Sequence, residues 1–174
     1  MNNYRTSKFT NFVNYCNKNL SGKKLREIKN FSSEEDISDK FYNLEQPHGS
    51  YGNWMIHIDI IYFQYNKKIY QLGFQYQDET CKINCSRPGK YYNTSTPDEI
   101  KEFICLFKNN VPKDYRVNPP KTRAYVSMSK KYKTIGSLSD EEFAKELYLK
   151  FLDALKIIEI LKKAFIEFGC QFYN

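Results

Sequence analysis

The sequence predicts an α+β fold, in which an antiparallel sheet from two hairpins packs on one long C-terminal helix. Residues 139–169 place apolar side chains at helical spacing between two helix-end signals, and residues 54–76 alternate apolar and polar side chains as strands do. No linker or repeat divides the 174 residues, so we expect one α+β domain over residues 1–174. The expected order of elements is α-ββ-α-ββ-α, with four strands, or five if residues 81–93 add one.

The C-terminal helix has a recognisable beginning and end. Ser139 is placed to cap it, Glu142 completes a capping box, and Gly169 fits the position just after a helix terminus. At about 1.5 Å per residue the helix is roughly 44 Å long, and no other segment can span the domain. Its main apolar face comprises Ala144, Leu147, Phe151, Ala154, Ile158, Leu161, Phe165 and Phe168.

Three further apolar residues of this helix, Leu149, Ile160 and Ile166, fall among its charged side chains. Either one large core wraps the helix and buries them, or the sheet packs on one side of the helix and another chain on the other. An exposed apolar line usually marks a contact. The second alternative therefore predicts an interface at Leu149, Ile160 and Ile166, in a homodimer or with a protein partner.

The chain begins with a predicted helix over residues 6–20, which Gly22 ends. Residues 23–53 show no clear periodicity, and their last part, residues 47–53, is rich in Gly, Pro and Asn and predicts a loop. The apolar face of the first helix comprises Phe9, Phe12, Val13, Cys16 and Leu20.

The clearest strand signals lie in residues 54–63 and 70–76, where apolar and polar side chains alternate. A two-residue loop at Asn66–Lys67 would put the two apolar faces on opposite sides of the sheet, because side chains alternate with a period of two. We therefore predict a loop with an odd number of residues, with Asn66 near the left-handed conformation. The faces running from Trp54 to Tyr62 and from Tyr70 to Tyr76 should then both contact the long helix.

The second half of the chain repeats the pattern of helix and hairpin. Residues 96–99 form a capping box and predict a helix that ends near Asn109. Residues 113–117 and 123–128 predict a second hairpin around the rigid turn at 118–120. The order of elements resembles that of small bacterial secretion chaperones, which are dimeric binding proteins, although the basic charge of this chain departs from them. The residues expected to face inward from the middle helix are Ile100, Phe103, Ile104 and Phe107.

The composition favours a folded protein of the cytoplasm. Apolar residues make up 41% of the chain and aromatic residues 17%, which is typical of globular domains. No apolar run is long enough to span a membrane, and residues 1–8 lack the apolar core of a signal peptide, so we expect no membrane partner. The cysteines form an odd, scattered set that indicates free thiols in a reducing compartment: Cys16, Cys81, Cys85, Cys105 and Cys170.

The excess positive charge is concentrated in one segment. The chain carries a net charge of +7, and residues 113–133 contain seven basic residues against one acidic residue, Asp114. Cations neutralise phosphates and aromatic faces accept unstacked bases, so this segment predicts a nucleic-acid-binding hairpin. The predicted binding residues are Lys113, Arg116, Lys121, Arg123, Tyr125, Lys130, Lys131, Tyr132 and Lys133.

Two other interpretations of the basic hairpin stay open. Its lysines could form a solvated strand edge that prevents edge-to-edge association, or they could bind an acidic protein partner. No helix-turn-helix, zinc finger or other named nucleic-acid motif supports the nucleic-acid interpretation. Strand alternation would put Arg123, Tyr125, Ser127 and Ser129 on a polar face of the hairpin, with Ala124, Val126, Met128 and Lys130 on the other.

Signals for catalysis or cofactors are weak. His57 and Asp59 share a strand face and could form a proton relay or hold a metal, but the sequence offers no further carboxylate or lysine in register. Cys81 and Cys85 lack a second Cys or His pair at zinc-site spacing, although His48 and His57 could in principle join them. The chain has no phosphate-binding glycine loop, dinucleotide fingerprint or nucleophile elbow. We therefore expect no metal, no cofactor and no catalytic residue.

The sequence thus favours a non-enzymatic binding protein whose basic hairpin engages nucleic acid or a nucleoprotein complex. The abundance of Asn, Lys, Ile, Tyr and Phe suggests an AT-rich coding genome, and with it a bacterial or phage defence, counter-defence or mobile-element system. The alternative function is a protein–protein inhibitor or adaptor that acts through the apolar helix surface. A nuclease-like enzyme at His57 and Asp59 is the third and weakest interpretation.

Overall fold

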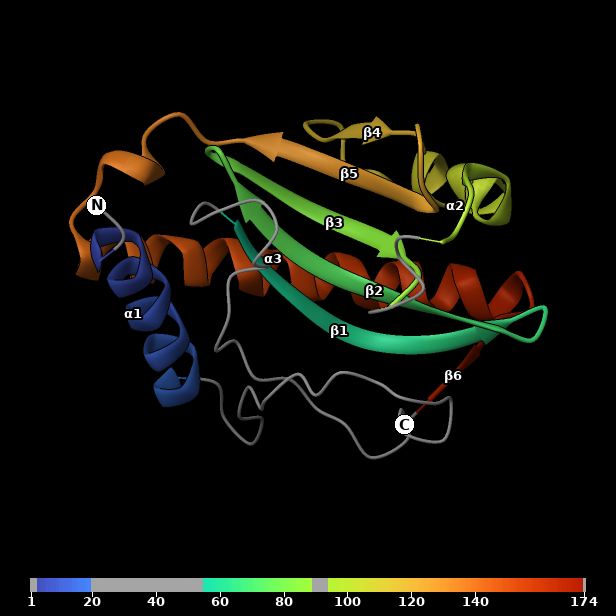
Figure 1. Ribbon diagram of the computed structural model, residues 1–174, viewed down its shortest axis with the longest axis horizontal. Helices are drawn as coiled ribbons and strands as arrows, with labels where there is room; N and C mark the ends of the chain where they lie inside the picture. Colours follow the sequence, from blue (N-terminus) through green and yellow to red (C-terminus); the bar gives the residue numbers. More distant parts are fainter. Residues whose placement is uncertain (1–2, 20–54, 89–93, 174) are drawn as a thin grey trace.

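The computed structural model describes residues 3–19, 55–88 and 94–173, and it confirms the α+β fold (Figure 1). Six strands form one antiparallel sheet in the order β4-β5-β3-β2-β1-β6, with a long C-terminal helix packed against it. The elements are α1 (Asn3–Asn19), β1 (Met55–Tyr65), β2 (Lys68–Gln77), β3 (Thr80–Ser86), the 3₁₀ turns η3 (Pro97–Glu99) and η4 (Lys101–Phe103), α2 (Ile104–Asn110), β4 (Arg116–Asn118), β5 (Tyr125–Lys131), the 3₁₀ turn η5 (Ile135–Ser137), α3 (Asp140–Glu167) and β6 (Gln171–Phe172).

Both ends of α3 follow the local signals in the sequence. Ser139 and Glu142 form the predicted capping box, in which the Glu142 amide donates to Ser139 Oγ at 3.4 Å and the Ser139 amide donates to Glu142 Oε2 at 3.3 Å. At the other end Gly169 has a φ of 103°, a left-handed conformation that suits glycine at this position. The chain then turns back and adds β6, a sixth strand that the sequence did not predict, to the edge of β1. None of the described helices is long and apolar enough to cross a membrane.

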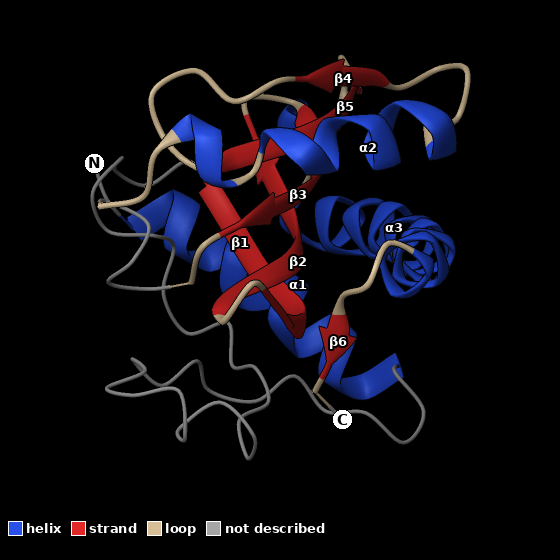
Figure 2. Cartoon of the chain, turned by 90° about the vertical axis from the view of Figure 1, so that its right-hand side faces the viewer, coloured by secondary structure: helices blue, strands red, loops and turns tan. Residues whose placement is uncertain are grey.

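The core lies between the helices α2 and α3 and one face of the sheet (Figure 2). We call this face of the sheet the inner face. Phe63 of β1 is fully buried at its centre, with its ring centroid 5.6 Å from that of Phe103 and 5.1 Å from that of Phe165. Each phenylalanine buried in this way contributes about 1.5–3 kcal/mol relative to an exposed side chain. The opposite side of the sheet, the outer face, has no described helix packed on it.

Helix α1 packs against helix α3. The ring of Phe12 lies 6.2 Å from that of Phe151, and the ring of Tyr15 lies 5.3 Å from that of Tyr148. The predicted end of this helix at Leu20 and Gly22, and the interpretation of residues 23–53, lie outside the described residues.

The β1–β2 connection corrects our prediction of an odd loop. It is a two-residue turn at Asn66 and Lys67, with φ angles of 49° and 59°, and Tyr65 pairs with Lys68. Positive φ at both central residues is typical of the tight hairpin turn whose twist matches that of the strands, which explains why the chain prefers it.

A β-bulge between Asp59 and Ile61 performs the register change that we had assigned to the loop. The bulge inserts one extra residue, so Ile58 and Phe63 both contact the core although five positions separate them. The prediction that Tyr62 faces the long helix is therefore wrong. Tyr62 pairs with Gln71 and donates its hydroxyl to Asp59 Oδ2 at 2.9 Å, on the outer face.

The helix predicted between residues 96 and 109 is present in a broken form. Its capping box forms, with the Thr96 amide donating to Glu99 Oε1 at 2.9 Å, but η3 and η4 precede the α-helical turns of α2. Ile100 interrupts the helical backbone with φ and ψ of −128° and −2°. Its side chain and those of Phe103 and Phe107 are nevertheless fully buried, as the sequence predicted.

Candidate functional site

The basic hairpin forms as β4 and β5, and its residues divide between the two faces of the sheet. Ala124, Val126 and Met128 are buried on the inner face, so the predicted alternation along β5 is confirmed. Residues that lie directly opposite one another on adjacent strands have their side chains on the same face of the sheet, and this places two further cations. Arg116 lies opposite Ser129 and therefore on the outer face, and Lys131 lies opposite Thr80 on the same face.

Lys130 belongs to the opposite side of the sheet and has an acidic partner. Its ammonium forms an ion pair with Asp114 and lies 5.2 Å from the centre of the Tyr132 ring. The hydrogen bond from Lys130 lowers the pKa of the Asp114 carboxyl and raises the pKa of Lys130 itself. This lysine and Tyr132 thus form a local cluster that is separate from the outer face.

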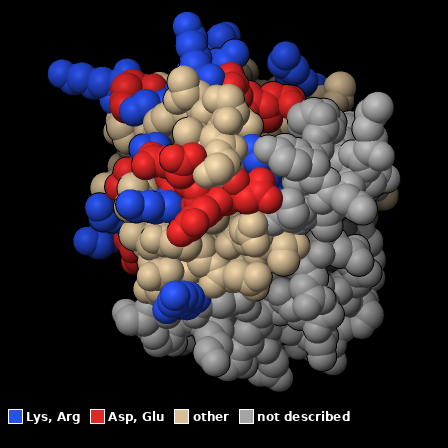
Figure 3. Space-filling view, turned by 90° about the vertical axis from the view of Figure 1, so that its left-hand side faces the viewer, with Lys and Arg blue, Asp and Glu red and all other residues tan. Residues whose placement is uncertain are grey.

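Two further predicted residues, Lys113 and Lys133, are exposed in the segments that precede β4 and follow β5. Figure 3 views the end of the molecule at which α3 begins, where Asp and Glu side chains form a band among the Lys and Arg side chains. Positive charge is therefore not uniform over this side of the molecule. The cations of residues 113–133 do not form one continuous cluster, because Lys130 lies on the opposite face of the sheet from Arg116 and Lys131.

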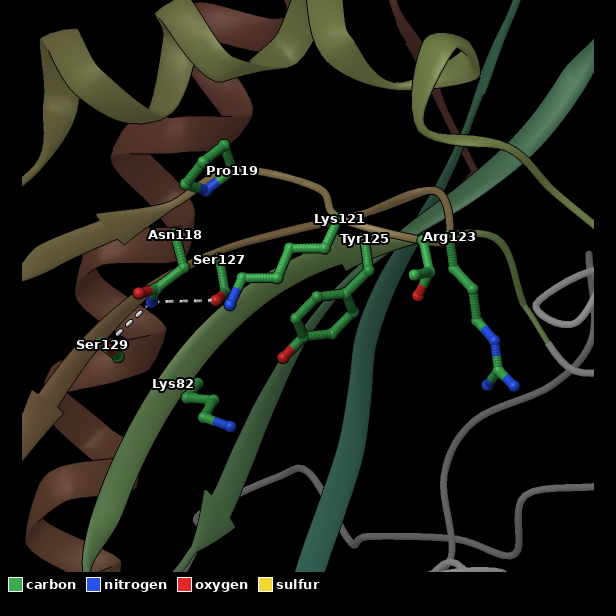
Figure 4. A pocket seen from close by; sticks show the side chains of 9 residues that line it. Lys82, Asn118, Pro119, Lys121, Arg123, Tyr125, Ser127 and Ser129 are labelled. Atoms are coloured by element: carbon green, nitrogen blue, oxygen red, sulfur yellow. Dashed lines mark hydrogen bonds between the residues drawn. The ribbon is translucent and has the colours of Figure 1, made fainter.

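A pocket of about 420 Å³ opens on the outer face beneath the β4–β5 loop (Figure 4). None of its described lining residues is acidic, and three of them, Lys82, Lys121 and Arg123, are cations. Arg116 and Lys131 lie on the same face of the sheet, and we call these five cations the outer basic patch. The lining residues are Lys82, Asn118, Pro119, Lys121, Thr122, Arg123, Tyr125, Ser127 and Ser129.

Lys82 is the pocket cation that the sequence reasoning missed. It lies on β3 between Gln75 of β2 and Ser129 of β5. Burial lowers its pKa, while the charge of Asp78 acts in the opposite direction. The alternation of Lys82, Asn84 and Ser86 with apolar residues along β3 was a usable signal, but it identifies a polar face without indicating which strand lies beside it.

The floor of the pocket is held by a short hydrogen-bond network. The Asn118 side-chain amide donates to Ser129 Oγ at 2.8 Å and to Ser127 Oγ at 3.3 Å. A serine hydroxyl has one donor and two acceptor sites, so accepting from Asn118 leaves its proton able to donate elsewhere. Cations and hydroxyl donors suit a ligand rich in anionic oxygens, such as a phosphate group.

His57 and Asp59 lie together on the outer face, outside the described lining of the pocket. The distance between His57 Nε2 and Asp59 Oδ1 is 2.9 Å, and Gln71 Nε2 lies 3.3 Å from His57 Nε2. Asp59 is only 7% exposed, and its second oxygen accepts from Tyr62. The pair is thus built into the sheet surface with both carboxylate oxygens in use, which favours a structural role over catalysis.

The described residues contain no group of three or more side chains suited to hold a metal ion. Cys81 and Cys85 are buried on the inner face, where burial raises the pKa of the Cys81 thiol to about 12. A buried thiol that resists ionisation is a poor metal ligand, because metals bind the thiolate. The proposed contribution of His48 lies outside the described residues.

The three predicted interface residues on α3 are exposed but separated. Leu149, Ile160 and Ile166 expose 43%, 53% and 51% of their surface. Leu149 and Ile160 share one side of the helix, and Asp153 and Lys156, which form an ion pair at 3.3 Å, occupy the positions between them. Ile166 is turned away from that line by helical spacing, so the three residues do not form a continuous apolar surface.

Comparison with known protein families, with curated protein sequences and with solved structures gives no match for this chain. The function is therefore inferred from the geometry and charge of its own residues.

Proposed function

We propose that this protein is a non-enzymatic nucleic-acid-binding protein of the cytoplasm, and that it binds through the outer basic patch. The observation that carries the proposal is the pocket lining, which combines three cations with four hydroxyl groups and, among its described residues, no carboxylate. All five cysteines of the chain are free thiols, in keeping with a reducing compartment.

The charge distribution supports a polymer rather than a single small anion. Arg116 and Lys131 lie beside the pocket on the same sheet face, in strands β4 and β5. A row of cations that extends past a pocket can neutralise several successive phosphates, and this supplies most of the affinity of sequence-independent nucleic-acid binding. Lys130 is excluded from the binding set because its charge is already paired with that of Asp114.

The test is a salt titration of binding to labelled oligonucleotides between about 50 and 200 mM KCl. A triple variant reverses three patch charges, Arg116→Glu, Lys121→Glu and Lys131→Glu. We expect it to lose binding at all salt concentrations, whereas wild-type affinity falls steeply as salt rises.

A matched control variant reverses three exposed lysines on helices of the inner side, Lys108→Glu, Lys145→Glu and Lys163→Glu. It has the same net charge as the patch variant, so a general electrostatic effect would weaken both equally. Equal weakening, or no binding by the wild type, would contradict the proposal. If the wild-type protein binds an acidic protein instead of nucleic acid, the alternative of an acidic protein partner is supported. A bacterial or phage setting is proposed from composition alone.

A further inference from the structure

Tyr125 lies along the surface of the sheet instead of standing up from it. Its hydroxyl donates to Gln75 Oε1 at 2.9 Å, although Tyr125 belongs to β5 and Gln75 to β2, with β3 between them. Neighbouring strands are about 4.8 Å apart, so only a ring laid across the intervening strand can reach that far. Figure 4 shows the ring spread over the strands in this way.

The position at which the ring crosses β3 follows from the strand register. Ser86 lies opposite Tyr125, and Lys82 lies opposite Gln75, so the ring passes over Asn84, the outward-facing residue between them. Asn84 is fully buried, and neither atom of its side-chain amide has a hydrogen-bond partner among the described residues. The ring thus covers this part of the sheet, and Tyr125 is also one of the residues that line the pocket.

Charged and polar side chains line the pocket together with this ring. Lys82 lies on one side of it, and Figure 4 shows the Lys121 side chain running back toward Ser127, while Arg123 points away. The serine hydroxyls at the floor are held by Asn118 and retain donor capacity. A flat aromatic ring beside cations and hydroxyl donors matches the two parts of a nucleotide, its base and its phosphate.

We propose that the pocket takes one unstacked nucleotide of a single-stranded nucleic acid, with the base against the Tyr125 ring and the phosphate near Lys82 and Lys121. This inference rests on the proposed function and adds that the strand is single. In a duplex the bases are stacked on one another and cannot lie against a protein ring, whereas proteins that bind single strands use aromatic side chains as stacking platforms. A pocket of about 420 Å³ is in the range of small-molecule sites and admits one base, not a helix.

The test compares single-stranded and duplex oligonucleotides of equal length and matched sequence, at one salt concentration, by fluorescence anisotropy. Tyr125→Leu keeps apolar bulk but removes the aromatic ring, and Tyr125→Phe keeps the ring but removes the hydrogen bond to Gln75. We expect wild-type protein to prefer the single strand. Tyr125→Leu should weaken single-strand binding roughly tenfold to a hundredfold and leave duplex binding unchanged, whereas Tyr125→Phe should lose much less.

The failures of the two proposals are distinguishable in the same experiment. If duplex and single strand bind equally well and Tyr125→Leu changes neither, the inference is overturned while the outer basic patch remains the binding surface. If neither polymer binds, both proposals fall. Urea denaturation of each variant shows whether it is folded, and Tyr125→Phe keeps the inference testable if Tyr125→Leu does not fold.

Discussion

Gly73 of β2 lies directly opposite Asp59 of β1, at the start of the bulge that changes the register of the hairpin. A Cβ atom at position 73 would lie 2.7 Å from the carbonyl oxygen of Ile58 and 3.3 Å from His57 Nε2. The first of these atoms belongs to the backbone and cannot move independently of the strand. The close approach of β1 to β2 at this point therefore requires glycine.

We expect Gly73→Ala to lower the free energy of unfolding by about 1–3 kcal/mol, the usual cost of overpacking. Urea denaturation followed by circular dichroism measures it. Gly136→Ala is the control, because a Cβ there would meet side-chain atoms only, the nearest at 3.6 Å, which is ordinary contact. Equal unfolding midpoints for the two variants would show that β1 and β2 are farther apart than described.

The Lys8 side chain connects α1 to the segment that precedes α3 by two hydrogen bonds. It is only 6% exposed, and its ammonium donates to the carbonyl oxygens of Leu138 at 2.7 Å and Gly136 at 3.0 Å. Lys8→Met keeps the apolar stem but leaves both carbonyl oxygens without this donor. We expect it to cost about 1.5–3 kcal/mol in urea denaturation, as for hydrogen bonds to charged groups. Lys18→Met changes an exposed lysine of the same helix and should cost almost nothing.

Lys67 occupies a left-handed conformation in the β1–β2 turn, with a φ of 59°. A residue with a Cβ is strained there, and glycine is the preferred second residue of this turn type. We therefore expect Lys67→Gly to raise the free energy of unfolding by about 0.5–1 kcal/mol, after allowance for the greater entropy of glycine in the unfolded chain. A lower urea midpoint would show that the exposed Lys67 side chain makes a stabilising contact.

Glu99 connects the end of the first hairpin to the segment before α2. Burial acts to raise the pKa of its carboxyl, but the hydrogen bond from the Thr96 amide and the charges of Lys68 and Arg87 outweigh burial and lower it. A lowered pKa in the folded state means that the stabilisation is fully present above the unfolded-state value of about 4.3 and is lost as pH falls through the folded-state pKa.

Wild-type protein should therefore lose more stability than Glu99→Gln as the pH falls below about 4.3, and the two should converge in acid. Urea denaturation over a series of pH values measures the difference between the two proteins, which removes the shared contributions of other carboxylates. Parallel curves with a constant offset would show that Glu99 acts through packing and not through its charge.

The features that the sequence predicted well depend on residues close together in the chain. Ser139 and Glu142 are three positions apart, and Gly169 comes just after Phe168, the residue that caps the end of α3. Alternation along β5 likewise depends only on the strand geometry, so the polar side of Tyr125 and the apolar side of Val126 were predictable.

The features that were missed depend on distant packing. The bulge near Asp59 is needed because both halves of β1 must bury apolar residues against the helices, which no local pattern in the strand reveals. Lys82 joins the pocket only because β3 pairs with β5, more than 40 residues later in the chain. The same alternation that predicted the faces of β5 also separates Lys130 from Lys131, so a run of cations in sequence does not become one patch in space.

The binding of a labelled single-stranded oligonucleotide at increasing KCl, to wild-type protein and to the two triple charge variants, tests the central claim most directly. We predict that the logarithm of the wild-type association constant falls linearly with the logarithm of salt concentration. Because each phosphate contact contributes about 0.7 to that slope for a single strand, reversal of Arg116, Lys121 and Lys131 should remove about 2 units of slope or abolish binding. The control with Lys108, Lys145 and Lys163 reversed should keep the wild-type slope. Identical slopes for the two triple variants, or a wild-type association constant that does not change with KCl concentration, would contradict a binding role for the outer basic patch.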